Sequence, residues 1–296
     1  MVTDLSEPRF TTEQLIAGAA QYGLHATPRL ITDWASLGLI AHPWKPGAGK
    51  GNGWKKGTWS AAQASLFLDL LTLRQDPEHP LRSVAALANG PVLSWLLTEN
   101  RSDVPLEQVR LALATWCGRH RSRQHTPGAR VKKLAREITS QIESPQASES
   151  QCRELRKIIE RNIRYQQFDV AQLHAAVEAA FNPRRVVDSV GPKDAPMTVA
   201  SIMRGLEAQA TAFLSLETFS DEEYEDARIV YRRGLFRYDE MQPLLDSDPQ
   251  RGSMRFEPRT FDRDFLSACK DMVLLLGMGR LSPGRRAEVA KRGDGS

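Results

Sequence analysis

Helical spacing of apolar residues dominates the start of the chain. Thr11 and Gln14 form a capping-box pattern that begins a first helix, and Gly23 ends it. Thr27 and Pro28 begin a second helix, because threonine is a favoured N-cap and proline is favoured at the first helical position. Two helices joined by a short glycine-led turn predict a helix-turn-helix.

The second helix, about residues 28–37, separates its side chains into two faces before Gly38 ends it. The apolar face carries Leu30, Ile31, Trp34 and Leu37. The opposite face carries Arg29, Thr32, Asp33 and Ser36. One face is therefore suited to a core, and the other presents short polar side chains and an arginine to a partner.

A β-hairpin is predicted after this helix, over about residues 43–59. Aromatic and apolar residues flank a tip of glycine and asparagine at 46–53, which is typical of a hairpin turn. Ser60 and Gln63 then form a second capping-box pattern, which begins a strongly apolar helix. Short helical segments complete the region up to residue 98.

The rest of the chain is helical in pattern. The predicted fold class is mainly α, with an N-terminal winged helix-turn-helix that has a small β-hairpin wing, followed by an all-helical C-terminal domain. Residues 190–196, with a glycine and two prolines, are the best candidate for an internal linker. The predicted domains are 1–98 for the winged helix-turn-helix, 99–190 for a helical region serving dimerisation or extra DNA contact, 191–281 for a C-terminal helical domain and 282–296 for a flexible tail.

Positive charge is concentrated in two segments of a chain whose formal net charge is only +4. Residues 42–60 carry four lysines and no acidic residue. Residues 101–136 carry nine lysines and arginines against Asp103 and Glu107. Segregated positive charge lets a nearly neutral protein attract a polyanion, although such a segment is more commonly a solvated helix face and loop.

The remaining composition predicts a cytoplasmic binding protein without a membrane segment. Apolar runs such as Met272–Leu276 are too short to span a bilayer, and the N-terminus lacks the pattern of a signal peptide. The cysteines are isolated, which predicts neither a disulfide framework nor a metal site. Cys117, His120 and His125 lack a fourth ligand for zinc. No catalytic motif occurs, so we expect no enzyme activity, cofactor or metal.

The outward face of the second helix is predicted to read DNA bases, because a major groove is wide enough to admit an α-helix. Arg29 is the best candidate, since its guanidinium can bond both acceptors of a guanine at once. Asp33 either accepts a bond from a cytosine amino group or orients Arg29 from the next turn. A plain amphipathic hairpin of helices is the alternative.

The hairpin lysines are predicted to contact the phosphate backbone. They are Lys45, Lys50, Lys55 and Lys56. Glycine lets the backbone approach phosphates closely, and lysine supplies attraction that does not depend on sequence. The tip lacks the spacing GxxxxGK(S/T), which disfavours a nucleotide site. Thr12, in the first helix, completes the candidate DNA-binding residues. Trp44, Trp54 and Trp59 are expected to pack the hairpin onto the helices.

Residues 9–97 resemble the DNA-binding domain of the MerR family of transcriptional regulators. The matching pieces are Thr27-Pro28-Arg29, Trp34, Leu37-Gly38-Leu39-Ile40, the wing closing at Trp59-Ser60, and His79-Pro80-Leu81. The resemblance implies DNA contact at Arg29, structural aromatics at Trp34 and Trp59, and dimerisation through a later helix. The chain departs from the family where Thr32 and Gly57 replace arginines of the recognition helix and the wing.

Three functions remain open from the sequence. The preferred one is a transcriptional regulator that binds double-stranded DNA as a homodimer, with a protein or small-molecule effector at its C-terminal domain. The second is an excisionase-like or other architectural DNA-binding factor of a mobile element, since such factors share the domain fold. The third is a helical protein-interaction module without DNA binding.

Overall fold

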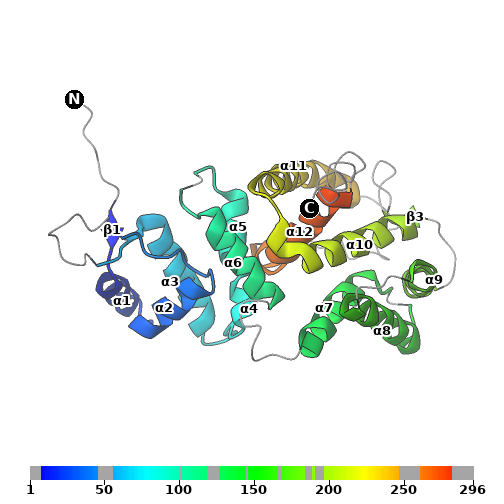
Figure 1. Ribbon diagram of the computed structural model, residues 1–296, viewed down its shortest axis with the longest axis horizontal. Coiled ribbons are helices and arrows are strands. Elements are labelled where there is room, and N and C mark those ends of the chain that lie inside the picture. Colours follow the sequence, from blue (N-terminus) through cyan, green and yellow to red (C-terminus); the bar gives the residue numbers. More distant parts are fainter. Residues whose placement is uncertain are drawn as a thin grey trace, which may run out of the picture. The chain divides into compact units, whose positions relative to one another are not determined.

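The computed structural model describes residues 8–45, 56–100, 102–118, 127–144, 146–165, 169–183, 189–190, 197–246 and 261–281. Helices make up most of these residues and the strands are short antiparallel pairs, so the mainly α prediction is confirmed (Figure 1). The chain packs into two compact units. The first contains Met1–Ser122 and Phe261–Cys269, and the second contains Arg123–Thr260 and Lys270–Ser296.

The first helix of the first unit begins as its sequence predicts. α1 (Thr12–Gln21) starts at a capping box in which the Gln14 N–H donates to Thr11 Oγ1 at 3.3 Å and the Thr11 N–H donates to Gln14 Oε1 at 2.8 Å. These bonds satisfy backbone donors that have no partner within the helix. α1 ends before Gly23, where the backbone turns towards the second helix.

The second helix has the predicted cap and the predicted end. α2 (Pro28–Ser36) starts where the Thr27 side chain accepts a hydrogen bond from the Leu30 N–H at 3.2 Å. Gly38 follows with a φ of +72°, in the left-handed region that favours glycine. The helix-turn-helix is therefore formed by local signals at both helix ends.

The base of the predicted wing is a pair of short antiparallel contacts. Trp44 and Thr58 exchange backbone hydrogen bonds of 2.8 and 3.0 Å. Next to them, β2 (Trp59–Ser60) pairs with β1 (Arg9–Phe10), a strand that precedes α1. The hairpin pattern did not reveal β1, because its partner lies about fifty residues away along the chain. Residues 46–55 lie outside the described part of the wing.

Further helices pack behind the helix-turn-helix. They are α3 (Ala61–Gln75), α4 (Val84–Leu87), α5 (Asn89–Leu97) and α6 (Leu106–Cys117). Trp34 from α2 packs edge-on against Phe67 from α3, with ring centroids 5.5 Å apart, and both side chains are buried. The start of α12 (Phe261–Leu281) joins this unit, where the Cys269 N–H donates to Asn89 Oδ1 at 2.9 Å.

α6 packs directly on the end of α2. A Cβ atom at Gly38 would lie 2.5 Å from the Ala112 nitrogen and 2.7 Å from the Gln108 carbonyl oxygen, so only glycine fits. The Thr115 hydroxyl also donates to the Leu37 carbonyl at 2.8 Å. The first unit therefore includes α6, which lies within the range 99–190 that the sequence assigned to a separate helical region.

The second unit is built mainly from amphipathic helices. Its elements are α7 (Pro127–Ile142), α8 (Glu149–Tyr165), α9 (Val170–Phe181), β3 (Ser189–Val190), β4 (Met197–Thr198), α10 (Val199–Ser215), the 3₁₀ turn η1 (Leu216–Thr218), α11 (Asp221–Asp246) and the rest of α12. α7, α8 and α9 pack against one another in chain order. β3 and β4 pair antiparallel on either side of the predicted linker, whose residues 191–196 lie outside the described part of the chain, as does the predicted tail 282–296.

α10 and α12 pack with almost no space between their backbones. A Cβ atom at Gly277 would lie 2.8 Å from Ala208 Cα and still closer to the Ala208 carbonyl group. One turn away on α12, Leu274 contacts the position where Gly205 would carry a Cβ, at 3.8 Å. Small residues therefore let these two helices meet.

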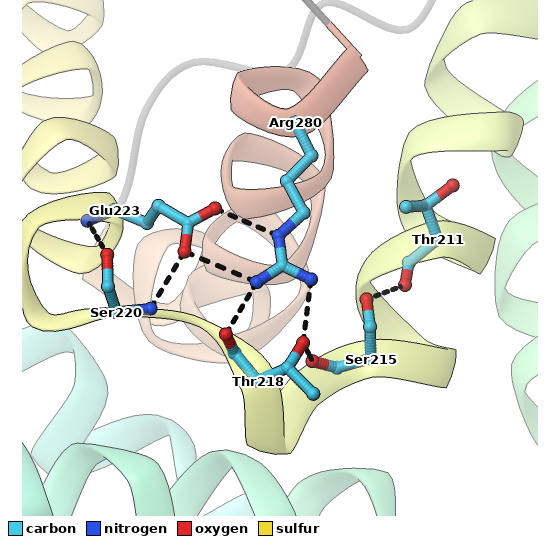
Figure 2. Close-up of polar contacts among 6 residues, drawn as sticks. All are labelled: Thr211, Ser215, Thr218, Ser220, Glu223 and Arg280. Carbon is cyan, nitrogen blue, oxygen red and sulfur yellow. Dashed lines mark hydrogen bonds and ion pairs between the residues drawn. The ribbon is translucent and has the colours of Figure 1, made fainter. Parts of the chain in front are cut away.

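A single arginine side chain connects the end of α12 to the start of α11 by hydrogen bonds (Figure 2). Arg280 Nε donates to Glu223 Oε1 at 2.8 Å, and its terminal nitrogens donate to the Thr218 hydroxyl and carbonyl, each at 2.7 Å. The guanidinium also lies 3.7 Å from the centre of the Phe219 ring. Burial acts to raise the pKa of Glu223, but the bonds and charge of Arg280 and the bonds of Ser220 lower it below its usual value.

Candidate nucleic-acid interface

α2 presents the predicted polar face. Ile31 and Trp34 are buried, whereas the Arg29 side chain is 91% exposed and Thr32 is also exposed. Asp33 and Ser36 are half-buried at the side of this face. Arg29 is therefore the long side chain that reaches outward from the helix.

Local bonds orient the polar face of α2. Arg29 Nε lies 3.9 Å from Asp33 Oδ2, which is the orienting pair that the i, i+4 spacing predicted. The Thr32 hydroxyl donates to the Pro28 carbonyl at 3.1 Å, and the Ser36 hydroxyl donates to the Asp33 carbonyl at 2.8 Å. Both hydroxyls thus use their proton on the helix backbone and offer only lone pairs outward.

An acidic residue from α1 pairs with one lysine at the base of the wing. Lys56 Nζ donates to Glu13 Oε1 at 2.6 Å, and both side chains are largely exposed. This hydrogen bond from Lys56 is the main cause that lowers the pKa of Glu13 from 4.5 to about 2. The segment 42–60 contains no acid, so its sequence does not reveal the contact. Lys45 is exposed, while Lys50 and Lys55 lie outside the described residues.

The tryptophans of the wing divide between two roles. Trp59 is buried and its indole N–H donates to the Ala41 carbonyl at 2.8 Å, as expected for a structural residue. The same expectation is wrong for Trp44, which is 53% exposed and lies against Arg9, with 4.4 Å between the guanidinium carbon and the ring centre. Trp44 is paired with Thr58, and neighbouring strand residues face opposite sides, so Trp44 points away from the side that Trp59 fills. Trp54 lies outside the described residues.

The two arms of the wing come close together at Gly57. A Cβ atom at Gly57 would lie 2.7 Å from Pro43 Cβ on the opposite arm. A side chain at 57 would therefore push the two arms apart. Thr12, the remaining candidate, is half-buried in the first turn of α1 beside Glu13.

Two buried amides behind the interface were not found from the sequence. Gln63 accepts from the Ala41 N–H at 2.7 Å and donates to Gln108 Oε1 at 2.9 Å and to the Asp103 carbonyl at 2.6 Å. Gln108 in turn donates to the Leu39 carbonyl at 3.3 Å. The side chain of Gln63 therefore does not return to cap Ser60 as the second capping-box pattern predicted. It fixes the segment between α2 and the wing instead.

The second basic segment is divided between the two units. Arg110 lies on α6 in the first unit, whereas Lys132 and Arg136 are exposed on α7 in the second. Several of its other basic side chains lie outside the described residues, including those of Arg119, Arg121, Arg123, Arg130 and Lys133. No contiguous surface is assigned to this segment.

Comparisons with protein-family models, with curated proteins and with solved structures find no match to this chain. Within the described residues, no helix has both the length and the apolar character needed to cross a membrane. Those residues also contain no cluster of histidine, cysteine and carboxylate side chains that could hold a metal ion. The exposed side chains of the helix-turn-helix and the wing form the candidate site.

Proposed function

We propose that this protein is a sequence-specific DNA-binding transcriptional regulator with a MerR-like winged helix-turn-helix. Two adjoining features together support this function. α2 has an exposed polar face from which Arg29 reaches outward, and the hairpin next to it bears exposed lysine. Such a helix suits a major groove, and lysines beside it suit the flanking phosphates. A protein with this function acts on DNA in the cytoplasm.

The two kinds of contact have different tasks in this proposal. Arg29 reads guanine through two parallel hydrogen bonds, and Asp33 keeps its guanidinium aligned. Lys45 attracts phosphate without regard to sequence and releases counterions as it binds. The buried amides of Gln63 and Gln108 keep the wing in a fixed position beside α2.

Arg29→Ala is expected to relax sequence preference, with a loss of about 1–3 kcal/mol at a preferred site and little change at random DNA. Lys45→Ala is expected to weaken binding to all duplexes alike and to reduce the salt slope by about 1. Selection from random duplexes supplies the preferred site, and fluorescence anisotropy over a salt series measures both variants.

The Lys45 variant is the matched control for Arg29, because each removes one positive charge from an exposed position. Equal losses on preferred and random DNA for Arg29→Ala would contradict base reading by α2. Binding that is independent of sequence but bends the duplex would support an architectural factor. Absence of any duplex binding at low salt would favour a protein-interaction module.

Glu13→Gln is expected to strengthen binding to every duplex by roughly two- to tenfold at low salt, because Lys56 then turns from carboxylate to phosphate. The pKa of Glu13 is lowered to about 2, so its charged form favours folding above pH 4.5 and this contribution is lost as the pH falls towards 2. Glu13 is therefore fully charged near neutral pH, and the gain in DNA affinity from Glu13→Gln should not depend on pH there.

Glu78→Gln supplies the control for this prediction. Glu78 is an exposed acid of the same unit, and its replacement changes the net charge by the same amount away from the wing. If both variants raise the affinity equally, the effect comes from net charge alone, and the pairing of Glu13 with Lys56 does not govern phosphate contact.

A further inference from the structure

Trp44 is a large aromatic side chain that the first unit leaves in contact with solvent. It is 53% exposed, whereas Trp59 at the same base of the wing is only 5% exposed. The guanidinium carbon of Arg9 lies 4.4 Å from the centre of the Trp44 ring and covers one face of it. Because more than half of the side chain stays exposed beside this contact, the other face of the ring is open to a ligand.

The strand register places Arg9 and Trp44 on the same side of the short strands. Trp44 is opposite Thr58, and Arg9 is opposite Ser60. Thr58 and Ser60 are two residues apart, so their side chains and those of their partners share one face. Trp59, between them, faces the other way and is buried. The register therefore holds the arginine and the ring together on the outside of the wing base.

The surroundings of the exposed ring are positively charged. Lys45 follows it in the chain and is exposed, and residues 42–60 contain no acid. The contact with the ring leaves the charge of Arg9 in place, whereas the charge of Lys56 is neutralised by Glu13. A cationic ligand would be repelled here, although cations otherwise bind well to tryptophan. The site therefore favours a flat ligand that stacks on the ring and carries negative charge.

A nucleobase on its phosphate chain meets both requirements. Every base has a π-face, and exposed aromatic side chains in basic surroundings bind unpaired bases by stacking on that face. In an intact duplex, neighbouring base pairs cover these faces, so that a protein reaches only the base edges and the backbone. The open face of Trp44 therefore suits a base that has left the stack of the duplex.

We infer that Arg9 and Trp44 form a stacking site for an unpaired base of DNA at the base of the wing. The inference rests on the proposed function, because α2 and the wing lysines bring the duplex to this site. Trp44 supplies the ring face, and Arg9 holds the ring from the other side and attracts the phosphate of the unpaired nucleotide. The site adds a preference for DNA with an unpaired base beside the sequence that α2 reads.

The test uses the full chain and compares the preferred duplex with copies that carry one extra, unpaired base at each position in turn. Fluorescence anisotropy measures the affinities. The parent chain is expected to bind one or two of the bulged duplexes more tightly than the perfect duplex. Trp44→Ala is expected to lower the affinity for those duplexes by about 5- to 100-fold and to change the affinity for the perfect duplex less than about twofold. Trp44→Phe should retain most of the preference, because phenylalanine also stacks.

Tyr22→Ala provides the matched control. Tyr22 is an aromatic residue of the same unit and is 72% exposed, but it lies at the end of α1 instead of the wing. Its replacement should leave the preference for a bulged duplex unchanged. Circular dichroism of each variant checks that the helices are retained.

The inference alone is overturned if Arg29→Ala weakens binding to the perfect duplex, but no bulged duplex shows a preference that depends on Trp44. Equal losses on perfect and bulged DNA for Trp44→Ala also overturn it, because the ring then acts only through the fold of the wing. Competition by a free deoxynucleoside monophosphate that matches competition by bulged DNA would assign the site to free nucleotides instead. A parent chain that binds no DNA overturns both the proposed function and this inference.

Discussion

Gly38→Ala is expected to lower the free energy of unfolding by about 2–5 kcal/mol and to displace α6 from the end of α2. About 1–2 kcal/mol arises because alanine is strained at a φ of +72°. About 1–3 kcal/mol more arises because the new Cβ would lie 2.5 Å from the Ala112 nitrogen and 2.6 Å from Leu111 Cβ. Chemical denaturation measures the loss.

Gly23→Ala separates these two causes. Gly23 has nearly the same φ, 71°, but nothing lies within 4 Å of the position of its Cβ. Its replacement should cost only the backbone strain of about 1–2 kcal/mol. If Gly38→Ala and Gly23→Ala prove equally destabilising, α6 does not press on the end of α2 as described. If the packing is as described, Gly38→Ala should also weaken specific DNA binding more than Gly23→Ala does.

Gly277→Ala is expected to lower the free energy of unfolding by about 3 kcal/mol or more, because a new methyl group would overlap the Ala208 backbone. Backbone atoms cannot rotate aside as a flexible side chain can, and Ala208 is fully buried. α10 and α12 must therefore separate. Thermal unfolding followed by circular dichroism measures the change.

The nearby Gly279 supplies a matched control. It lies in the same helix, and nothing stands within 4 Å of the position of its Cβ. Gly279→Ala is expected to stabilise the protein by up to about 1 kcal/mol, because alanine is the better helix former. A stabilising effect of Gly277→Ala would show that the close contact between α10 and α12 is absent in solution.

Local chemistry made the start of the fold predictable. Thr11 and Thr27 each cap a helix by bonding to the residue three positions later, so the signal and its effect lie within one turn. The buried face of α2 follows from the spacing of Ile31 and Trp34. The Arg29–Asp33 pair follows from the same geometry, because residues four apart on a helix are neighbours.

Distant contacts determined the features that the sequence did not reveal. Lys56 is paired with Glu13 although 43 residues separate them. Gln63 looks like a capping residue in sequence, but its partner Gln108 is 45 residues away and draws its side chain inward. Trp44 and Trp59 have similar sequence surroundings. Only the pairing of the short strands places Trp44 outside and Trp59 in the core.

The sequence alone therefore determined the helical class, the helix ends and the polar face of α2, because each depends on residues within one or two turns. The tertiary structure decided that Glu13 pairs with a lysine of the wing and that α6 packs on the end of α2. Those properties depend on which distant surfaces meet, and a close fit such as that of Gly38 against α6 leaves no periodic pattern along the chain.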